Sequence, residues 1–144
     1  IWSFSWDNSW YVHQFLRRHA PKLLHHHWRG HYLLDRMLLA RKHFAYGEQM
    51  DYFDDHNIIG WTRLGTELHP HGVAVVLSDG PGGDKSMQTG KPDTRFVDLT
   101  QHCGDIVSTN AEGWGRFPCQ GGSVSIWIPE AAIPTALRDQ FKPA

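Results

Sequence analysis

Two short stretches carry oxygen-bearing side chains that could hold a metal ion. Asp54, Asp55, His56 and Asn57 follow one another directly, and Asp79 lies between an apolar run and a glycine-rich stretch. Carboxylate and amide oxygens are the ligands that calcium prefers in proteins. The same residue types also favour plain solvated turns. The sequence therefore leaves both a calcium site and two ordinary loops open.

The stretch from 78 to 86 also superficially matches a phosphate-binding loop. That motif requires glycine directly before the lysine and a helix after the serine. Here Asp84 precedes Lys85, and we expect a strand to follow. We therefore predict a tight turn between two strands instead of a nucleotide site.

The sequence nominates no catalytic nucleophile. No serine, threonine or cysteine occupies a glycine-flanked elbow, and no spacing pairs such a residue with a histidine and a carboxylate. Cys103 and Cys119 are the two cysteines, and we expect both in or near strands. There they act as small buried hydrophobes, or as a disulfide if the fold brings them together.

Three tryptophans are candidates for binding carbohydrate, because a flat indole face stacks on a sugar ring. Trp61 and Trp114 are flanked by glycine, and Trp127 lies in an apolar run. The alternative for each is packing in the protein core.

Residues 1–30 differ in composition from the rest and are left unassigned as a segment rich in Trp and His. Trp2, Trp6 and Trp10 recur every four residues, which is typical of one side of a helix. His27 and His31 would be neighbours on a helix and could bind zinc, but no third ligand follows at a fixed spacing.

Residues 31–46, with the sequence HYLLDRMLLARKHFAY, carry the strongest helical pattern. The apolar stripe runs through Leu34 and either Met37 or Leu38, and is widened by Leu33 and Phe44. Basic residues precede Gly47, so we predict that the helix ends there. The segment 31–52 is therefore assigned to this helix and a linker.

Beyond Phe53 the apolar period changes to two, in seven short segments separated by glycine and proline. This pattern predicts an antiparallel β domain over 53–130, built as a Greek-key sandwich or barrel. Val124, Ile126 and Ile128 alternate with polar residues and Trp127, which predicts a strand buried on one side only. The tail 131–144 could form one weak helical turn.

Length and charge exclude other classes of protein. A chain of 144 residues is the length of one domain. Fourteen Lys and Arg against 15 Asp and Glu give a net charge of −1, without the basic excess that binding to nucleic acid requires. There is no apolar run of about 18 residues, so we expect no membrane span.

A series of motifs between Leu33 and Glu130 resembles the C-terminal part of the liquefying-type bacterial α-amylases, in the α-amylase family of glycoside hydrolases. The motifs that carry the resemblance are ARKHFAYG at 40–47, DYFD at 51–54, IIGWTR at 58–63, LSDGPGG at 77–83, DLT at 98–100, NAEGWG at 110–115 and GGSVSIW at 121–127.

The resemblance implies that the helix is the last one of an incomplete (β/α)8 barrel and that 53–130 is the β domain beside that barrel. A complete barrel needs about 250 residues, but only about 50 precede the β region. Retaining glycosidases need two carboxyl groups about 5–5.5 Å apart. None of the 15 acidic residues lies in a catalytic motif of the family, so we expect the chain alone to be inactive.

The resemblance also implies part of a calcium site at His56, Asn57 and Asp79. Its other ligands would come from absent barrel loops, and asparagine at 57 removes a charge, so we predict weak or no calcium binding. The leading hypothesis is a C-terminal fragment of an enzyme of starch-type α-1,4-glucans that braces a barrel. The alternatives are a carbohydrate-binding module that takes α-glucan, and an interaction protein whose helix 31–46 packs on another protein surface.

Overall fold

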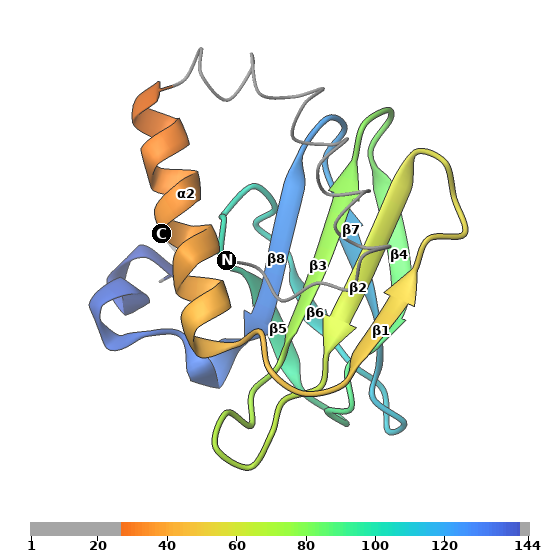
Figure 1. Cartoon of the computed structure of the whole chain (residues 1–144), viewed down its shortest axis with the longest axis vertical. Coiled ribbons are helices and arrows are strands. Elements are labelled where there is room, and N and C mark those ends of the chain that lie inside the picture. Colours follow the sequence, from red (N-terminus) through yellow and green to blue (C-terminus); the bar gives the residue numbers. More distant parts are fainter. Residues whose placement is uncertain (1–26, 142–144) are drawn as a thin grey trace.

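The structure, a computed structural model, describes residues 27–141. Within these residues one α-helix precedes eight strands, and two short 3-10 helices follow them (Figure 1). The elements are α2 (His27–His43), β1 (Gln49–Tyr52), β2 (Ile58–Arg63), β3 (Val73–Ser78), β4 (Gly83–Gln88), β5 (Arg95–Asp98), β6 (Ile106–Ser108), β7 (Trp114–Cys119), β8 (Val124–Pro129), η1 (Glu130–Ala132) and η2 (Thr135–Phe141).

The strands form two antiparallel sheets. Six strands pair in the order β1-β2-β3-β8-β5-β6, and β4 pairs with β7 in a second sheet. The chain leaves the larger sheet after β3 and returns to it beside β3 with β8, where Val75 pairs with Ile126. The prediction of a mainly antiparallel β fold after a helix is confirmed.

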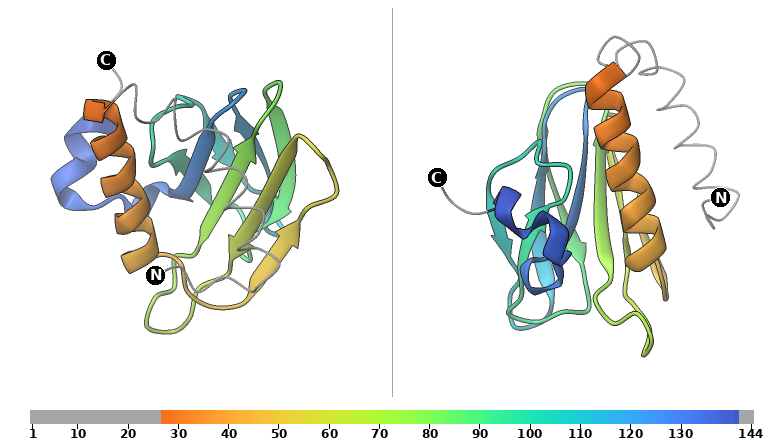
Figure 2. Two further views of the ribbon diagram at one scale, coloured as in Figure 1. Left: turned by 45° about the horizontal axis from the view of Figure 1, so that its top comes forward. Right: turned by 90° about the vertical axis from the view of Figure 1, so that its left-hand side faces the viewer.

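The larger sheet is covered on both faces. Helix α2 lies along one face, as the right-hand view of Figure 2 shows; it contributes Leu33 and Ala40 to the apolar cluster there, and Phe44, directly after the helix, joins them. A second cluster lies between the two sheets and includes Met87 of β4 and Phe117 of β7. Burial of each large side chain contributes about 1.5–3 kcal/mol to folding.

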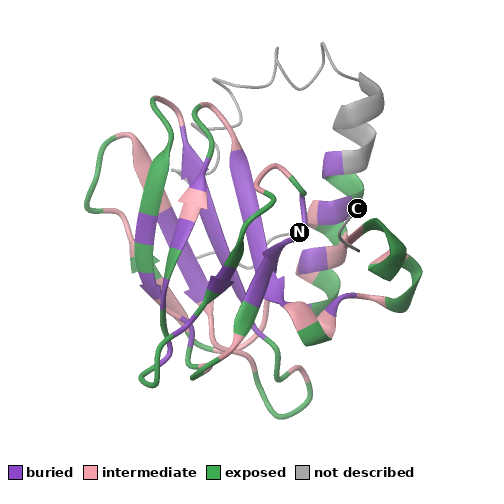
Figure 3. Cartoon of the chain, turned by 180° about the vertical axis from the view of Figure 1, so that it is seen from behind, coloured by how far each residue is buried: buried purple, intermediate pink, exposed green. Residues whose placement is uncertain are grey.

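This double cover corrects the prediction for the strand over 124–128. Val124, Ile126 and Ile128 face the helix side as expected, but Ser125 and Trp127 are also fully buried. The β4–β7 sheet covers that second face, so the strand is buried throughout, as the purple colour of the central strands in Figure 3 shows. The pairing of β4 with β7 joins segments far apart in the sequence and is not visible in a local pattern.

The buried stripe of α2 also differs from the prediction. Leu34 and Leu38 are half exposed, whereas Leu33, Arg36 and Ala40 are buried against the sheet and the C-terminal tail. The stripe is therefore rotated by about one residue. The reason is that the Arg36 guanidinium is held inside, where it donates to Gln140 and lies 6.0 Å from the ring centre of Phe141.

The helix ends at His43, four residues before Gly47. Gly47 has φ of +89° and forms a bridge with Gly65, and a Cβ at Gly47 would lie 2.1 Å from the Gly65 carbonyl oxygen. Glycine is therefore required at position 47 because the backbone of Gly65 lies so close, and not because it caps the helix. The next residues form β1, which pairs with β2, so the sheet begins inside the segment predicted as a linker.

The tail forms η2 where a weak helical turn was expected. None of the helices described between residues 27 and 141 is long and apolar enough to cross a membrane. The tryptophan pattern at Trp2, Trp6 and Trp10 lies outside the described residues, as do the side chains of His27 and His31.

Candidate functional site

The loop 53–57 joins β1 to β2, and the carboxyl group of Asp55 holds its turn. Asp55 Oδ1 accepts hydrogen bonds from the backbone N–H groups of Asn57, at 2.8 Å, and Ile58, at 3.3 Å. These two bonds lower the pKa of the Asp55 carboxyl below its usual value. Asp55 therefore shapes a turn in the way that aspartate commonly does.

His56, Asn57 and Asp79 lie at one end of the β2–β3 pair. The Asp79 N–H donates to the Asn57 carbonyl oxygen at 3.1 Å. A Cβ added at Gly80 would lie 3.0 Å from Asn57 Oδ1, so the amide oxygen faces the loop after β3. The exposed His56 ring lies with Nε2 3.1 Å from Asn57 Nδ2. The structure thus brings together the three residues predicted for calcium.

A buried lysine lies beneath this loop. Lys85 on β4 donates from Nζ to Asp54 Oδ1 at 2.5 Å and to the Ile58 carbonyl at 3.2 Å. The hydrogen bond from Lys85 is the main cause of a lowered pKa at Asp54. Lys85 was not predicted to take part in the site. Its ammonium group thus places a positive charge against the carbonyl of Ile58, the residue that follows Asn57.

The residues present fit a calcium ion only in part. Calcium takes six to eight oxygen ligands, whereas this cluster offers the side-chain oxygens of Asn57 and Asp79 and an imidazole. Among residues 27–141, no group of three or more His, Cys, Asp and Glu side chains is placed to hold a metal. The part of the chain that the structure describes therefore supplies a fraction of a calcium shell.

We expect calcium to bind the 144-residue chain with a Kd of roughly 10⁻⁴ M or weaker, because the ligand set carries one formal negative charge and is incomplete. Isothermal titration with calcium chloride measures this value, and Asp79→Asn serves as the matched control. Sub-micromolar binding that Asp79→Asn removes would contradict the expectation.

The three predicted carbohydrate-binding tryptophans lie in different environments. Trp61 is 3% exposed in the cluster under α2, and Trp127 is 0% exposed between the two sheets. The Trp127 indole donates from Nε1 to the Pro118 carbonyl at 3.3 Å. A sugar cannot reach either indole face, which removes Trp61 and Trp127 from the predicted carbohydrate site.

Trp114 remains accessible at 40% exposure. It begins β7 opposite Gln88, and its ring meets that of Tyr52 edge to face, with the ring centres 6.3 Å apart. The Tyr52 hydroxyl accepts from the Gln88 N–H at 3.0 Å, which joins the β1 edge to the smaller sheet. The exposed indole of Trp114, beside the half-buried ring of Tyr52, has the chemistry of a sugar-stacking surface.

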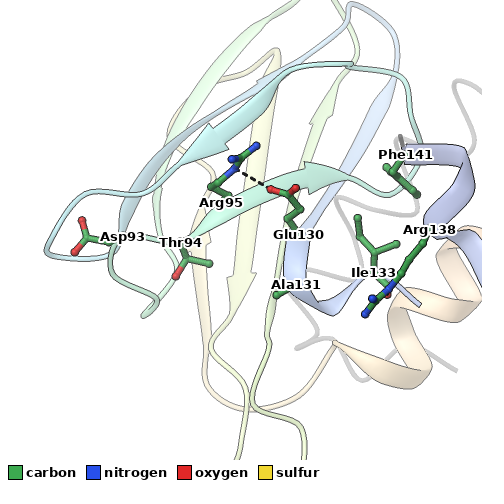
Figure 4. A pocket seen from close by; sticks show the side chains of 8 residues that line it. All are labelled: Asp93, Thr94, Arg95, Glu130, Ala131, Ile133, Arg138 and Phe141. Carbon is green, nitrogen blue, oxygen red and sulfur yellow. Dashed lines mark hydrogen bonds and ion pairs between the residues drawn. The ribbon is translucent and has the colours of Figure 1, made fainter. Parts of the chain in front are cut away.

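An open pocket of about 830 Å³ lies between the start of β5 and the tail (Figure 4). Arg95 Nε pairs with Glu130 Oε2 at 2.8 Å within it, and Arg138 Nε donates to the Ile133 carbonyl at 3.3 Å. Ile133 and Phe141 form its apolar wall. None of the sequence-predicted site residues lines this pocket, and its charged groups hold the tail against β5.

Sequence reasoning also missed the role of Asp98. This aspartate is 2% exposed, at the end of β5. Oδ1 accepts from the Thr100 N–H at 2.9 Å, the Thr100 hydroxyl at 2.6 Å and the Ile126 N–H at 3.2 Å. Oδ2 accepts from the Cys103 N–H at 3.0 Å. The carboxylate therefore organises the connection after β5.

The chain is similar to several curated proteins. It is 50% identical over 107 residues to an α-amylase of Geobacillus stearothermophilus, which covers 72% of this chain and 20% of that protein. It is 50% identical over 98 residues to the glucan 1,4-α-maltohexaosidase of Bacillus sp. (strain 707), and 42% identical over 115 residues to an α-amylase of Bacillus licheniformis. These matches cover 66% and 78% of this chain, and 19% and 21% of the relatives.

Among solved structures, an Anoxybacillus α-amylase matches 58% of this chain and 18% of its own, with a TM-score of 0.45 at 9% identity. AmyP, solved in complex with maltotriose, matches 64% of this chain and 18% of its own, with a TM-score of 0.45 at 13% identity. No family model matches the chain.

The chain spans about one fifth of the length of the curated relatives it matches. Two of these three relatives are named α-amylases, at 42% and 50% identity. The chain therefore belongs with the bacterial α-amylases, as a C-terminal part of such a glycoside hydrolase.

Proposed function

We propose that the described region serves as the C-terminal β domain of an α-amylase-type enzyme that acts on starch-type α-1,4-glucans. The catalytic carboxyl groups of that enzyme would lie outside this chain. The observation that carries the proposal is the 42–50% identity to three bacterial glucan-degrading enzymes, over about a fifth of their length.

The described carboxyl groups support a structural role. A retaining glycosidase needs a nucleophile and, beside it, an acid whose pKa is raised. The pKa values of Asp54 and Asp55 are shifted downward, by hydrogen bonds from Lys85 and from backbone N–H groups. Asp84 pairs with Arg116 on the exposed face of the smaller sheet, and Asp98 is surrounded by backbone donors. These environments suit packing and turns.

The outer face of α2 is the surface that we propose for contact with the catalytic part. Leu34 and Leu38 lie one turn apart and are 52% and 48% exposed, on the side opposite the buried Leu33 and Ala40. A pair of exposed leucines at this spacing is typical of a helix that packs on a second surface.

We expect the chain to restore starch hydrolysis to a related enzyme that lacks its own C-terminal fifth. The Geobacillus stearothermophilus α-amylase, shortened by the region that this chain matches, would be mixed with the 144-residue chain and assayed for release of reducing sugar. The β domain stabilises the shortened enzyme by binding its folded form, so activity and Tm should both rise with the concentration of the chain.

A variant of the outer helix face is the matched control. Leu34→Asp together with Leu38→Asp should fold normally, because both side chains are half exposed, yet should lose the rescue by at least about tenfold. Equal rescue by this variant would contradict the proposed contact. Absence of rescue by the unaltered chain would contradict the proposed function.

Trp114 favours a second candidate function, direct contact with α-glucan. Its exposed ring and the neighbouring Tyr52 offer a stacking surface of the kind that binds sugar rings. Retardation of the chain in a native gel that contains soluble starch, and its loss in Trp114→Ala, would support this function.

A further inference from the structure

The two cysteines of the chain converge on one place between the sheets. Cys103 follows β5 in the connection to β6, and Cys119 ends β7 in the smaller sheet. Cys119 belongs to the apolar cluster between the sheets, and Cys103 packs against that cluster. Both thiols are free in the structure.

Both sulfur atoms lie close to the side chain of Ser125. Cys103 Sγ lies 3.7 Å from Ser125 Oγ and 3.9 Å from the carbonyl oxygen of Pro118, the residue directly before Cys119. Cys119 Sγ lies 3.6 Å from the Val76 carbonyl oxygen, and Val76 is the direct strand partner of Ser125. Partners in an antiparallel pair have Cα atoms about 4.5–5.5 Å apart, so both thiols fall within one small neighbourhood.

We propose that Cys103 and Cys119 form an intramolecular disulfide under oxidising conditions, which ties the β5–β6 connection to β7. The bond would join the six-stranded sheet to the two-stranded sheet. A disulfide holds its Cβ atoms about 3.5–4.5 Å apart, and the Cys103 segment has room to adopt that spacing. Gly104, next in the chain, has space around it, because a Cβ added there would meet nothing within 4 Å.

A small disulfide such as oxidised glutathione supplies the oxidising equivalents. The Cys103 thiolate attacks one sulfur of the reagent, and one glutathione thiolate leaves. The Cys119 thiolate then attacks the Cys103 sulfur of the mixed disulfide, and the second glutathione thiolate leaves. Two protein thiols are oxidised and one reagent disulfide is reduced to two thiols, and the two protons that leave the protein thiols end on the two glutathione thiolates.

Burial sets the conditions for the reaction. Desolvation raises the pKa of the Cys103 thiol, and raises that of Cys119 to about 12. Both groups are therefore protonated near neutral pH, and the reactive thiolate becomes more abundant as the pH rises. Cys103 is the less buried of the two and is the point of entry for the reagent.

The reduced chain, incubated with oxidised glutathione at about pH 8.5, should lose about 2 Da as the disulfide forms. Trypsin should then release residues 96–116 and 117–138 as one linked pair, because Arg95, Arg116 and Arg138 bound these two peptides. The pair should separate on reduction. Cross-linking should also raise the Tm by roughly 5–10 °C, since it closes a loop of about 17 residues.

Two variants keep the test independent of folding defects. Cys103→Ser and Cys119→Ala should each fold, and each should abolish both the linked peptide pair and the oxidant-dependent rise in Tm. Full alkylation of both thiols after oxidation, a persistent glutathione adduct at Cys103, or a disulfide between two copies of the chain would each overturn the proposal. None of these measurements involves glucan. A failure of the disulfide proposal can therefore be distinguished from a failure of the proposed function.

Discussion

Replacement of Asp98 by alanine should destabilise the chain by about 4 kcal/mol, because removal of the carboxylate leaves several buried donors without a partner. The N–H groups of Thr100, Cys103 and Ile126 all donate to this one side chain. Ile126 belongs to the central strand β8, so one of the lost hydrogen bonds lies in the middle of the larger sheet. Urea denaturation followed by tryptophan fluorescence measures the change as a lower midpoint at unchanged slope.

Asp105→Ala is the control for charge and position. Asp105 lies in the same connection between β5 and β6 but is exposed, so its removal should change stability by less than about 0.5 kcal/mol. Equal effects of the two substitutions would show that Asp98 contributes only charge, and would contradict its role as the organiser of this connection.

Trp127→Ala should cost about 3–5 kcal/mol, the range for truncating a large aromatic side chain in a core. Trp127 is fully buried in β8, and its ring centre lies 5.8 Å from that of Phe117. Phe117 in turn meets Phe96 edge to face at 5.5 Å, so the three rings join β8, β7 and β5. The substitution leaves a cavity at the junction of the two sheets.

Trp114→Ala is the matched control, because it deletes the same side chain from an exposed position on the outer side of β7. Its expected cost is about 1 kcal/mol, since the contact with Tyr52 is partly solvated. In thermal unfolding, Trp127→Ala should therefore lower the Tm more than Trp114→Ala does. If Trp114→Ala were as costly as Trp127→Ala, the assignment of their environments would be wrong.

Local pattern was enough to predict the helix and the seven strands beyond Phe53, but it missed β1 in the segment predicted as a linker. The run of alternating apolar residues over 124–128 and the punctuation by glycine and proline mark each strand within the sequence itself. The turn over 79–82 was also predicted, because its glycines and proline exclude regular structure. The proximity of His56, Asn57 and Asp79 came from the family resemblance, and the structure places them at one end of β2–β3.

Long-range pairing explains what the sequence could not predict. Trp127 and Ser125 are buried because the sheet formed by β4 and β7 packs on their face of the larger sheet. No local spacing in the sequence predicts this packing. Arg36 occupies the buried side of α2 because Gln140 and Phe141 return to it from the other end of the chain. The role of Asp98 likewise cannot be predicted from the sequence, because it depends on a hydrogen bond from the Ile126 N–H of β8.

We propose that residues 27–141 serve as the β domain of an α-glucan hydrolase and that the 144-residue chain does not hydrolyse glucan alone. The most direct test is a native gel cast with soluble starch and calcium, run beside a gel without starch and then stained with iodine. We predict an iodine-stained background with no cleared band at the position of the chain. A cleared band that migrates with the purified 144-residue chain would contradict the claim, because it would place both catalytic carboxyl groups within this sequence.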